Sequence, residues 1–330
     1  MCALFGFLDY GKKIDGRTKK KLIQALSIAC EARGTDACGI SYVKNRELVI
    51  YKKAKPAHKL LLYFPGSVTC VIGHTRMATQ GSQKFNANNH PFEGYAGQTF
   101  ALAHNGVLYN DRTLRTTEKI PVPEIETDSY IAVQLIEKRQ QLSFDSLKYM
   151  AEKVSGTFTF TVLSEDNTLY FVKGSNPLSV VHFEELGLYV YASTAEILKK
   201  ALNCTILKYQ RKTDIDIADG EIMSIDSCGH IDKTTFDFID DSFGMYRSSF
   251  DTYYRDWFSS FENVTGKSDM DVLLENCRNF GIDEEAVILL MDYGYEPEEI
   301  ELMLDEPRLL YETINGLLYG EVESPYCCTV

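Results

Sequence analysis

The sequence predicts an α+β fold in which layers of helices cover sheets. The first 225 residues contain many short apolar segments, rich in β-branched and aromatic residues and bounded by turn residues, as strands are. Two longer segments repeat apolar residues at helical spacing instead. Residues 156–164, GTFTFTVLS, are β-branched or aromatic on both faces, so we expect both faces of the sheets to be covered.

The expected elements follow one another without a long linker. The first helix, at 17–33, carries an apolar stripe that includes Leu22 and Leu26. The second helix, at 127–139, begins at Thr127, a residue type that often caps helices. The expected strands lie at 2–8, 37–43, 68–74, 99–108, 156–164, 168–174, 188–194 and 220–226.

The composition changes near residue 235, where the chain becomes acidic and aromatic. Residues 269–320 show helical periodicity, in segments that start on Asp or Pro and often end near Gly. The sequence therefore predicts a larger domain at 2–235 and a small helical extension at 245–330. Apolar residues at helical spacing in this extension indicate a core, and no function follows from them.

Charge and cysteine content exclude several classes of protein. The net charge is -13 and the pI is near 5.0, so the field of the protein repels polyanions and we expect no nucleic-acid partner. No apolar stretch reaches the roughly 18 residues of a membrane helix, and the first residues lack a signal-peptide pattern, so we expect a cytoplasmic protein. The nine cysteines form no CxxC pair, and we expect no disulfide framework, metal or cofactor.

Polar residues and glycines gather in four short stretches. In the stretch GHTRMATQG at 73–81, two glycines bracket Thr75, Arg76 and Thr79 directly after an expected strand. This pattern is typical of a loop that wraps a small polar ligand and offers a guanidinium to a carboxylate, although a surface loop with an ion-paired arginine would look the same. The stretches are RGTDACG at 33–39, GHTRMATQG at 73–81, HNGVLYN at 104–110 and ETDSY at 126–130.

Four further residues have both a structural and a chemical interpretation. Asn105 and Gly106 fall near a strand end, where a side-chain amide and a backbone N–H can converge on one oxyanion, or where both residues simply serve a turn. Asp128 stands where a helix should begin, so it either caps that helix or binds a ligand ammonium. Cys2 is either a small buried residue at a strand start or a nucleophile.

The order of these residues decides between the interpretations. Cys2 is followed by RGTDACG, GHTRMATQG, HNG and ETD, and in this order and spacing the sequence resembles the class II glutamine amidotransferases. These enzymes are a branch of the N-terminal nucleophile hydrolases. The resemblance covers about residues 2–225 and implies a four-layered αββα sandwich.

The resemblance also implies a mechanism. The initiator methionine is removed, and the free α-amine of Cys2 acts as the base for its own thiol, which its pKa of about 8 allows near neutral pH. Cys2 would attack the side-chain amide of glutamine and form a γ-glutamyl thioester. Asn105 and Gly106 would stabilise the oxyanion, and Arg33 would help to set the geometry of the nucleophile.

The same resemblance assigns the substrate contacts. Arg76 would bind the α-carboxylate of glutamine and Asp128 its α-ammonium, with Thr75 and Thr79 among the substrate-binding residues. Met77 and Gln80 depart from residues common in the family, on the loop that would close over glutamine. Both departures lie away from the residues assigned to the chemistry, which is therefore expected to be retained.

The acceptor of the ammonia is expected on another protein, a separate synthase subunit. About 90 residues follow the expected domain, and they contain no P-loop, pyrophosphatase loop or phosphoribosyl loop. One alternative is a hydrolase of γ-glutamyl amides, because the assigned residues recognise only the glutamyl half of the substrate. A catalytically inactive binding or regulatory module is the alternative of a different class.

Overall fold

The computed structural model describes residues 2–238 and eleven separate positions between 277 and 314. The chain divides into two compact units, 1–245 and 246–330. In the second unit, buried apolar side chains such as Leu290, Ile300 and Leu310 form one cluster, and these three positions are helical. Most of the helical region expected at 269–320 lies outside the described residues.

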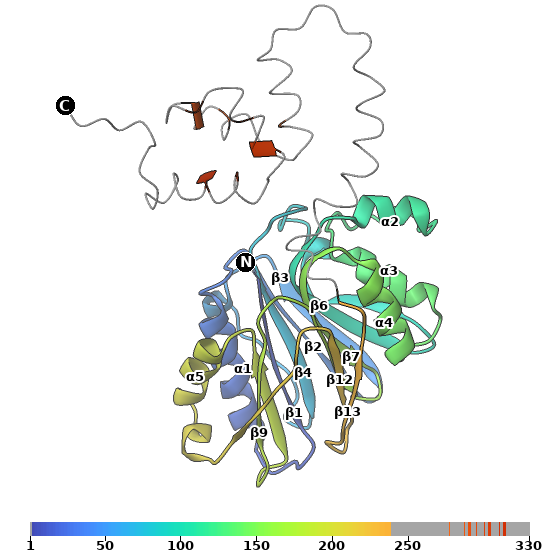
Figure 1. The fold of residues 1–330 in the computed structure, drawn as a ribbon. Coiled ribbons are helices and arrows are strands. Elements are labelled where there is room, and N and C mark those ends of the chain that lie inside the picture. The colour runs from blue at the N-terminus through green and yellow to red at the C-terminus, as the bar shows by residue number, and fades with distance from the viewer. Residues whose placement is uncertain are drawn as a thin grey trace, which may run out of the picture. The chain divides into compact units, whose positions relative to one another are not determined.

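The first unit contains two antiparallel sheets (Figure 1). The first sheet has the strand order β11-β9-β10-β1-β4-β2-β3 and the second has the order β13-β12-β8-β7-β6-β5. The strands of the first sheet are β1 (Ala3–Asp9), β2 (Ala37–Lys44), β3 (Glu47–Lys53), β4 (Cys70–Arg76), β9 (Ser179–Phe183), β10 (Leu188–Ala192) and β11 (Thr213–Ile215). Those of the second are β5 (Phe92–Tyr95), β6 (Thr99–Leu108), β7 (Gly156–Ser164), β8 (Leu169–Lys173), β12 (Glu221–Ile225) and β13 (Ile231–Thr235).

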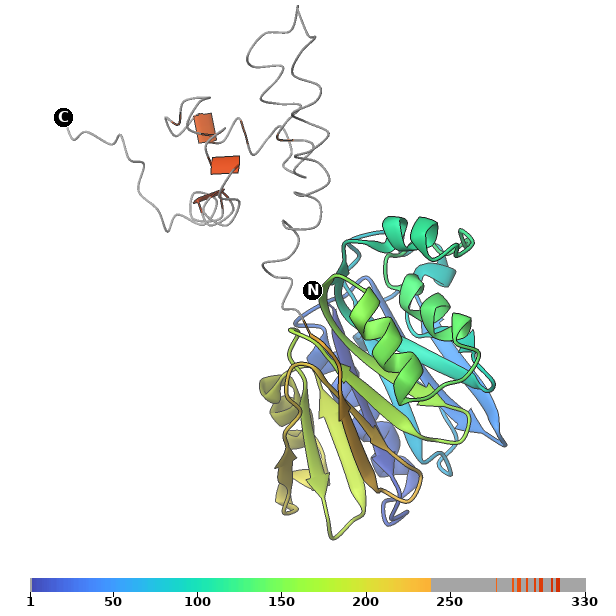
Figure 2. The same ribbon diagram turned by 45° about the vertical axis from the view of Figure 1, so that its right-hand side comes forward.

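Helices cover the outer faces of both sheets, as Figures 1 and 2 show from two directions. The first sheet is covered by α1 (Gly16–Cys30) and α5 (Ala195–Asn203), and α3 (Tyr130–Lys138) and α4 (Phe144–Lys153) cover the second. The short helix α2 (Asp111–Thr117) packs against α3. Single turns of 3₁₀ helix occur at Ala57–Lys59, Asn86–Asn88 and Ile206–Tyr209.

Three apolar cores separate these four layers. One lies between α1, α5 and the first sheet, one between the two sheets, and one between the second sheet and α3 and α4. All seven residues of β1 are buried, because one face of the strand meets helices and the other meets the second sheet. The αββα sandwich expected from the sequence is therefore confirmed.

The expected elements match the observed ones with one instructive exception. The helix expected to begin at Thr127 begins at Tyr130, and the preceding Ser129 makes no side-chain capping bond. Of the two interpretations of Asp128, the structure does not support helix capping, because its carboxylate bonds the backbone of β6 instead. By contrast, Asp15 does cap α1 by accepting the N–H of Thr18 at 2.6 Å.

Strand register brings the motif residues to one end of the sandwich. Ala3, the first residue of β1, pairs with Thr75 near the end of β4, so Cys2 lies beside the end of that strand. In the second sheet, Asn105 and Gly106 lie in the last half of β6, beyond the point at which β5 stops pairing with it. That half of β6 has β7 on one side and an open edge on the other.

Candidate active site

Cys2 is a buried thiol at the start of β1, with only 9% of the residue exposed. Its Sγ donates to the carbonyl of Met77 at 3.5 Å, and its own carbonyl accepts a hydrogen bond of 2.8 Å from Arg33 Nε. Burial raises the pKa of the Cys2 thiol above its ordinary value. The thiol is therefore protonated at neutral pH, and it needs a base before it can act as a nucleophile.

The segment after α1 holds the start of the loop that follows β4. The N–H of Asp36 donates to the Arg76 carbonyl at 2.9 Å, and Asp36 Oδ2 accepts the Ala78 N–H at 2.7 Å. A Cβ on Gly34 would lie 2.5 Å from the carbonyl carbon of Arg76, so only glycine allows this approach. Arg33, Gly34 and Asp36 of the RGTDACG stretch thus fix Cys2 and the loop relative to each other.

The guanidinium of Arg76 is buried and wrapped by the loop at 77–89. Its Nη1 donates to Asn89 Oδ1 at 2.8 Å, and its Nη2 donates to the carbonyls of Gln80 and Gly81 at 2.6 and 2.8 Å. Only 3% of Arg76 is exposed. The positive charge of Arg76 acts on the Cys2 thiol and opposes the effect of burial on its pKa, so the two groups are neighbours.

A reciprocal pair of hydrogen bonds ties this loop to the ETD stretch. Asn88 Nδ2 donates to Glu126 Oε2 at 2.8 Å, and the Glu126 N–H donates back to Asn88 Oδ1 at 2.9 Å. Gln80 Nε2 adds a bond of 3.1 Å to the Glu126 carbonyl. Our sequence analysis did not find Asn88 or Asn89. The signal in the sequence was the polar run NANN at 86–89. Its last two asparagines are buried, which is unusual for so polar a segment.

Asp128 lies beneath the open edge of β6, with 3% of the residue exposed. Its Oδ2 accepts the Leu108 N–H at 2.7 Å, and its Oδ1 accepts the Ser129 hydroxyl at 3.3 Å. Its negative charge acts to raise the pKa of the Cys2 thiol, whereas the charge of Arg76 acts to lower it. Buried charges of both signs therefore act on the thiol, and a free amino acid also carries one charge of each sign.

Asn105 and Gly106 provide donors with unusual environments. Asn105 is 1% exposed, and its Nδ2 has no hydrogen-bond partner within the described part of the chain. Gly106 has a φ of 149°, and a Cβ there would lie 1.8 Å from the Thr157 carbonyl oxygen. A buried amide without a partner is costly, so it marks a position at which a ligand oxygen would be stabilised.

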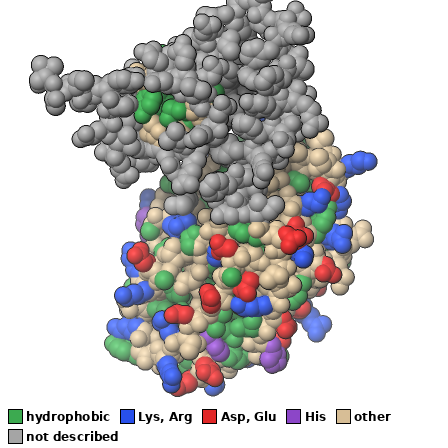
Figure 3. Space-filling model, in the orientation of Figure 1, with side chains coloured by type: hydrophobic (Ala, Val, Ile, Leu, Met, Phe, Trp, Pro, Cys, Tyr) green, Lys and Arg blue, Asp and Glu red, His purple; other side chains and the backbone are tan. Residues whose placement is uncertain are grey.

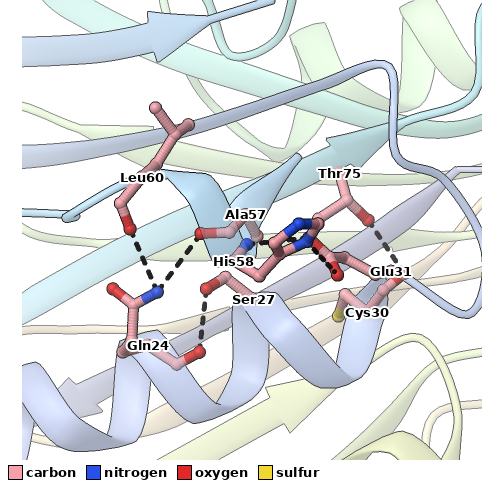
Figure 4. A network of polar contacts seen from close by, with 8 residues as sticks. All are labelled: Gln24, Ser27, Cys30, Glu31, Ala57, His58, Leu60 and Thr75. Atoms are coloured by element: carbon pink, nitrogen blue, oxygen red, sulfur yellow. Dashed lines mark hydrogen bonds and ion pairs between the residues drawn. The ribbon is translucent and has the colours of Figure 1, made fainter. Parts of the chain in front are cut away.

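The structure places the two threonines differently from the residues above. Figure 4 shows that Thr75 bonds the end of α1, where its hydroxyl donates to the Cys30 carbonyl at 3.1 Å. Successive residues of a strand face opposite sides, so Thr75 faces away from Arg76. The prediction that the Thr75 hydroxyl binds substrate therefore has no support in this geometry. Thr79 is exposed on the loop at 77–89.

Three buried histidines lie behind the charged residues. His74 Nε2 lies 2.9 Å from the His104 carbonyl, and the rings of His74 and His90 are 4.2 Å apart. Burial lowers the pKa of His74 to about 3 and that of His104 to about 4, and it also lowers the pKa of His90. All three rings are therefore neutral at physiological pH.

Within residues 2–238 and the separate positions of the second unit, no helix is long and apolar enough to cross a membrane. The same described residues contain no group of three His, Cys, Asp or Glu side chains arranged to hold a metal ion. On the face of the first unit seen in Figure 3, acidic and basic side chains are interspersed.

The chain is similar to several known proteins. A family described as "Glutamine amidotransferase domain" matches residues 74–200, which include the stretches that hold Arg76, Asn105 and Asp128. The glutamine–fructose-6-phosphate aminotransferase (isomerizing) of Geobacillus kaustophilus is 28% identical over 235 residues, which are 69% of this chain and 36% of that protein. The chain therefore contains a glutamine amidotransferase domain, and it is similar to class II glutamine amidotransferases.

Further relatives extend the comparison. The glutamine–fructose-6-phosphate aminotransferase of Staphylococcus epidermidis is 30% identical over 212 residues, covering 62% of this chain and 34% of that protein. This amidotransferase chain thus spans about a third of the length of these curated relatives. Among solved structures, glutamine phosphoribosylpyrophosphate amidotransferase from B. subtilis has the same fold, with a TM-score of 0.55 and 20% identity over 72% of this chain and 50% of that one.

Proposed function

We propose that this amidotransferase hydrolyses the side-chain amide of glutamine and passes the ammonia to an acceptor on a separate protein. The observation that carries the proposal is the pairing of the buried Cys2 thiol with buried charges of both signs, Arg76 and Asp128. A free amino acid carries one carboxylate and one ammonium. Arg76 binds the first and Asp128 the second, which directs the side-chain amide to Cys2.

The raised pKa of the Cys2 thiol explains why a base is needed. In the proposed mechanism the initiator methionine has been removed, and the α-amine of Cys2 takes the thiol proton. The thiolate attacks the amide carbon, the proton passes to the leaving nitrogen, and ammonia departs from a γ-glutamyl thioester. Water then hydrolyses the thioester, which releases glutamate and restores the thiol.

The oxyanion that forms at each step needs donors that are already in place. The buried Asn105 Nδ2, which lacks a partner in residues 2–238, and the Gly106 N–H supply them in this mechanism. Arg33 holds the Cys2 carbonyl and so fixes the direction of the nucleophile. In this mechanism the catalytic residues are Cys2, Arg33, Asn105 and Gly106.

Binding of the carboxylate requires a change in the loop at 77–89. Both carbonyls bonded by Arg76 Nη2 belong to this loop, at Gln80 and Gly81, so a bidentate carboxylate would have to displace them. We therefore propose that the loop moves when glutamine enters, and that the exposed Thr79 then reaches the substrate. The Asp36 and Glu126 contacts limit how far it moves.

The decisive experiment labels the protein with a glutamine analogue that carries a diazo ketone. We expect a single modification at Cys2, because only this thiol has a base and an oxyanion site next to it, and the eight other cysteines act as the internal control. Cys2→Ser should bind glutamine but lose most of its turnover. A chain with an uncleavable N-terminal tag, verified by intact mass, should be almost as inactive.

Full activity of the tagged chain would contradict the N-terminal nucleophile mechanism. A higher kcat/KM for a γ-glutamyl alkylamide than for glutamine would favour a γ-glutamyl amide hydrolase, and no labelling or turnover at all would favour an inactive binding module. The separate acceptor predicts equal amounts of glutamate and free ammonia from the purified chain. Amination of a sugar phosphate by this chain alone would contradict that part of the proposal.

A further inference from the structure

Asn176 lies between β8 and β9, outside every motif used above, and it bonds the proposed oxyanion site. Its Nδ2 donates to the Asn105 carbonyl at 2.9 Å. We infer that Asn176 is a positioning residue, which holds the Asn105–Gly106 peptide so that the Gly106 N–H faces the oxyanion. This inference rests on the proposed function, because it assigns a role within the same reaction.

The side chain of Asn176 is held in place through its own backbone. The Asn176 N–H donates to the Phe158 carbonyl at 3.3 Å, and its carbonyl accepts the Thr159 hydroxyl at 2.6 Å. Both partners belong to β7, and Thr159 is the residue that pairs with Asn105 on β6. Asn176 is therefore anchored to the strand beside the peptide that it bonds.

Because a peptide is planar, the hydrogen bond to the Asn105 carbonyl also fixes the direction of the Gly106 N–H. In a trans peptide the C=O and the next N–H point to opposite sides, so a carbonyl held on the β7 side directs the Gly106 N–H toward the open edge of β6. The N–H of Leu108, two residues further on, points to the same side of the strand, and it donates to Asp128. The Gly106 N–H thus faces the side on which the proposed substrate site lies.

The conformational freedom of glycine makes such a restraint necessary. Gly106 has a φ of 149°, a value that few other residues adopt, and glycine can also rotate out of it at little cost. On the inner side the peptide is packed closely, since a Cβ on Gly106 would lie 2.7 Å from Asn176 Nδ2. Without the amide of Asn176, the Asn105 carbonyl keeps only its ladder bond to the Thr159 N–H of β7. The peptide next to Gly106 is then held less firmly, and rotation takes its N–H away from the oxyanion.

The test compares Asn176→Ala and Asn176→Asp with the wild type, using Ser175→Ala as the matched control. Asn176→Asp keeps the size of the side chain but replaces the donor by an acceptor. Ser175 lies next to Asn176, and its buried hydroxyl has no partner among the described residues. We expect kcat for glutamine to fall about 10-fold in both Asn176 variants, less than the ~10²-fold typical for loss of a donor itself, with KM changed less than about twofold.

Inhibitor binding separates positioning from a structural role. The aldehyde of glutamate γ-semialdehyde adds the Cys2 thiol, forming a C–S bond while the proton passes to oxygen, so that its tetrahedral oxygen occupies the oxyanion site. The variants should bind this aldehyde about 10-fold more weakly and bind glutamate as the wild type does. Ser175→Ala should match the wild type in both measurements.

Two results would overturn the inference. One is a kcat in both Asn176 variants equal to that of the wild type, and the other is an equal loss of affinity for the aldehyde and for glutamate. If Asn176→Ala does not fold, the wild type is compared with Asn176→Asp alone, which retains the backbone contacts. A wild-type chain without glutaminase activity would instead contradict the proposed function.

Discussion

The space between the two sheets is apolar at one end of the strands and polar at the other. On β4, Cys70 and Ile72 belong to the apolar core, whereas Arg76 at the end of the strand is charged. On β6, the same side of the strand carries Ala101 and Ala103 in the core and then Asn105. β4 and β6 thus each carry apolar core residues and, a few residues further along, polar residues of the site.

The comparison shows that stability and chemistry are separated along the same strands. At the apolar end every side chain is packed, and burial supplies the free energy of folding. At the polar end the Asn105 amide is buried without a hydrogen-bond partner within residues 2–238, which costs stability. The fold tolerates this polar end because the apolar end and the two outer cores outweigh it.

Replacing a large side chain at the apolar end should have the largest effect on stability. Phe171 is fully buried between the sheets, with its ring perpendicular to that of Tyr191 and 4.9 Å from it. We expect Phe171→Ala to lower the free energy of unfolding by about 3–5 kcal/mol, measured by urea denaturation. The kcat of the folded fraction should stay unchanged, and Phe171→Leu should show a smaller loss. A tenfold drop in kcat at a temperature where Phe171→Ala is folded would refute the separation.

Replacing the cation at the polar end should instead act on substrate binding. Arg76→Lys removes a planar group that bonds Asn89, Gln80 and Gly81, and a point ammonium cannot bind a carboxylate through two parallel bonds. We expect KM for glutamine to rise by about 10-fold or more, with a smaller change in kcat. Lys84→Gln, an exposed change on the same loop, serves as the control. An unchanged KM would remove Arg76 from the substrate site.

The smallest effect concerns pH. In the folded chain the pKa of His104 is about 4, whereas an unfolded histidine titrates near 6.5. Between these values the unfolded chain binds more protons than the folded one, so the free energy of unfolding falls as the pH falls from about 6.5 to 4, by about 1.4 kcal/mol per pH unit for each such histidine. His104→Phe, beside Phe160, should reduce this slope by one proton. Equal slopes in the variant and the wild type would show that the histidine at position 104 is not buried as a neutral ring.

The layers of the fold, and the clustering of the site residues at one end of it, could be predicted from the sequence for physical reasons. A strand such as β7, β-branched or aromatic on both faces, requires cover on both sides, and most of the motif residues stand at strand ends or directly beyond them. Local patterns could not predict where Asp128 directs its carboxylate, because capping a helix and bonding a distant strand use the same residue type at the same position. Only the folded chain brings its Oδ2 to the Leu108 N–H.

Residues that act through long-range contacts were missed for a related reason. Asn88 and Asn176 each stand in a polar connecting segment, where asparagine usually serves a turn. Their partners, Glu126 and Asn105, are 38 and 71 residues away in the chain, so no local pattern marks them. Short strands with polar ends, such as β13, were missed because they lack a strong period.

Burial of the Cys2 sulfur also has a consequence for its chemical lifetime. Peroxides oxidise the thiolate, and the protonated thiol reacts slowly with them. Because burial raises the pKa of Cys2, the resting protein holds this sulfur in its least oxidisable form. In the proposed mechanism this sulfur becomes a thiolate only when a base withdraws its proton beside a bound amide, so it survives intact through long intervals between turnovers.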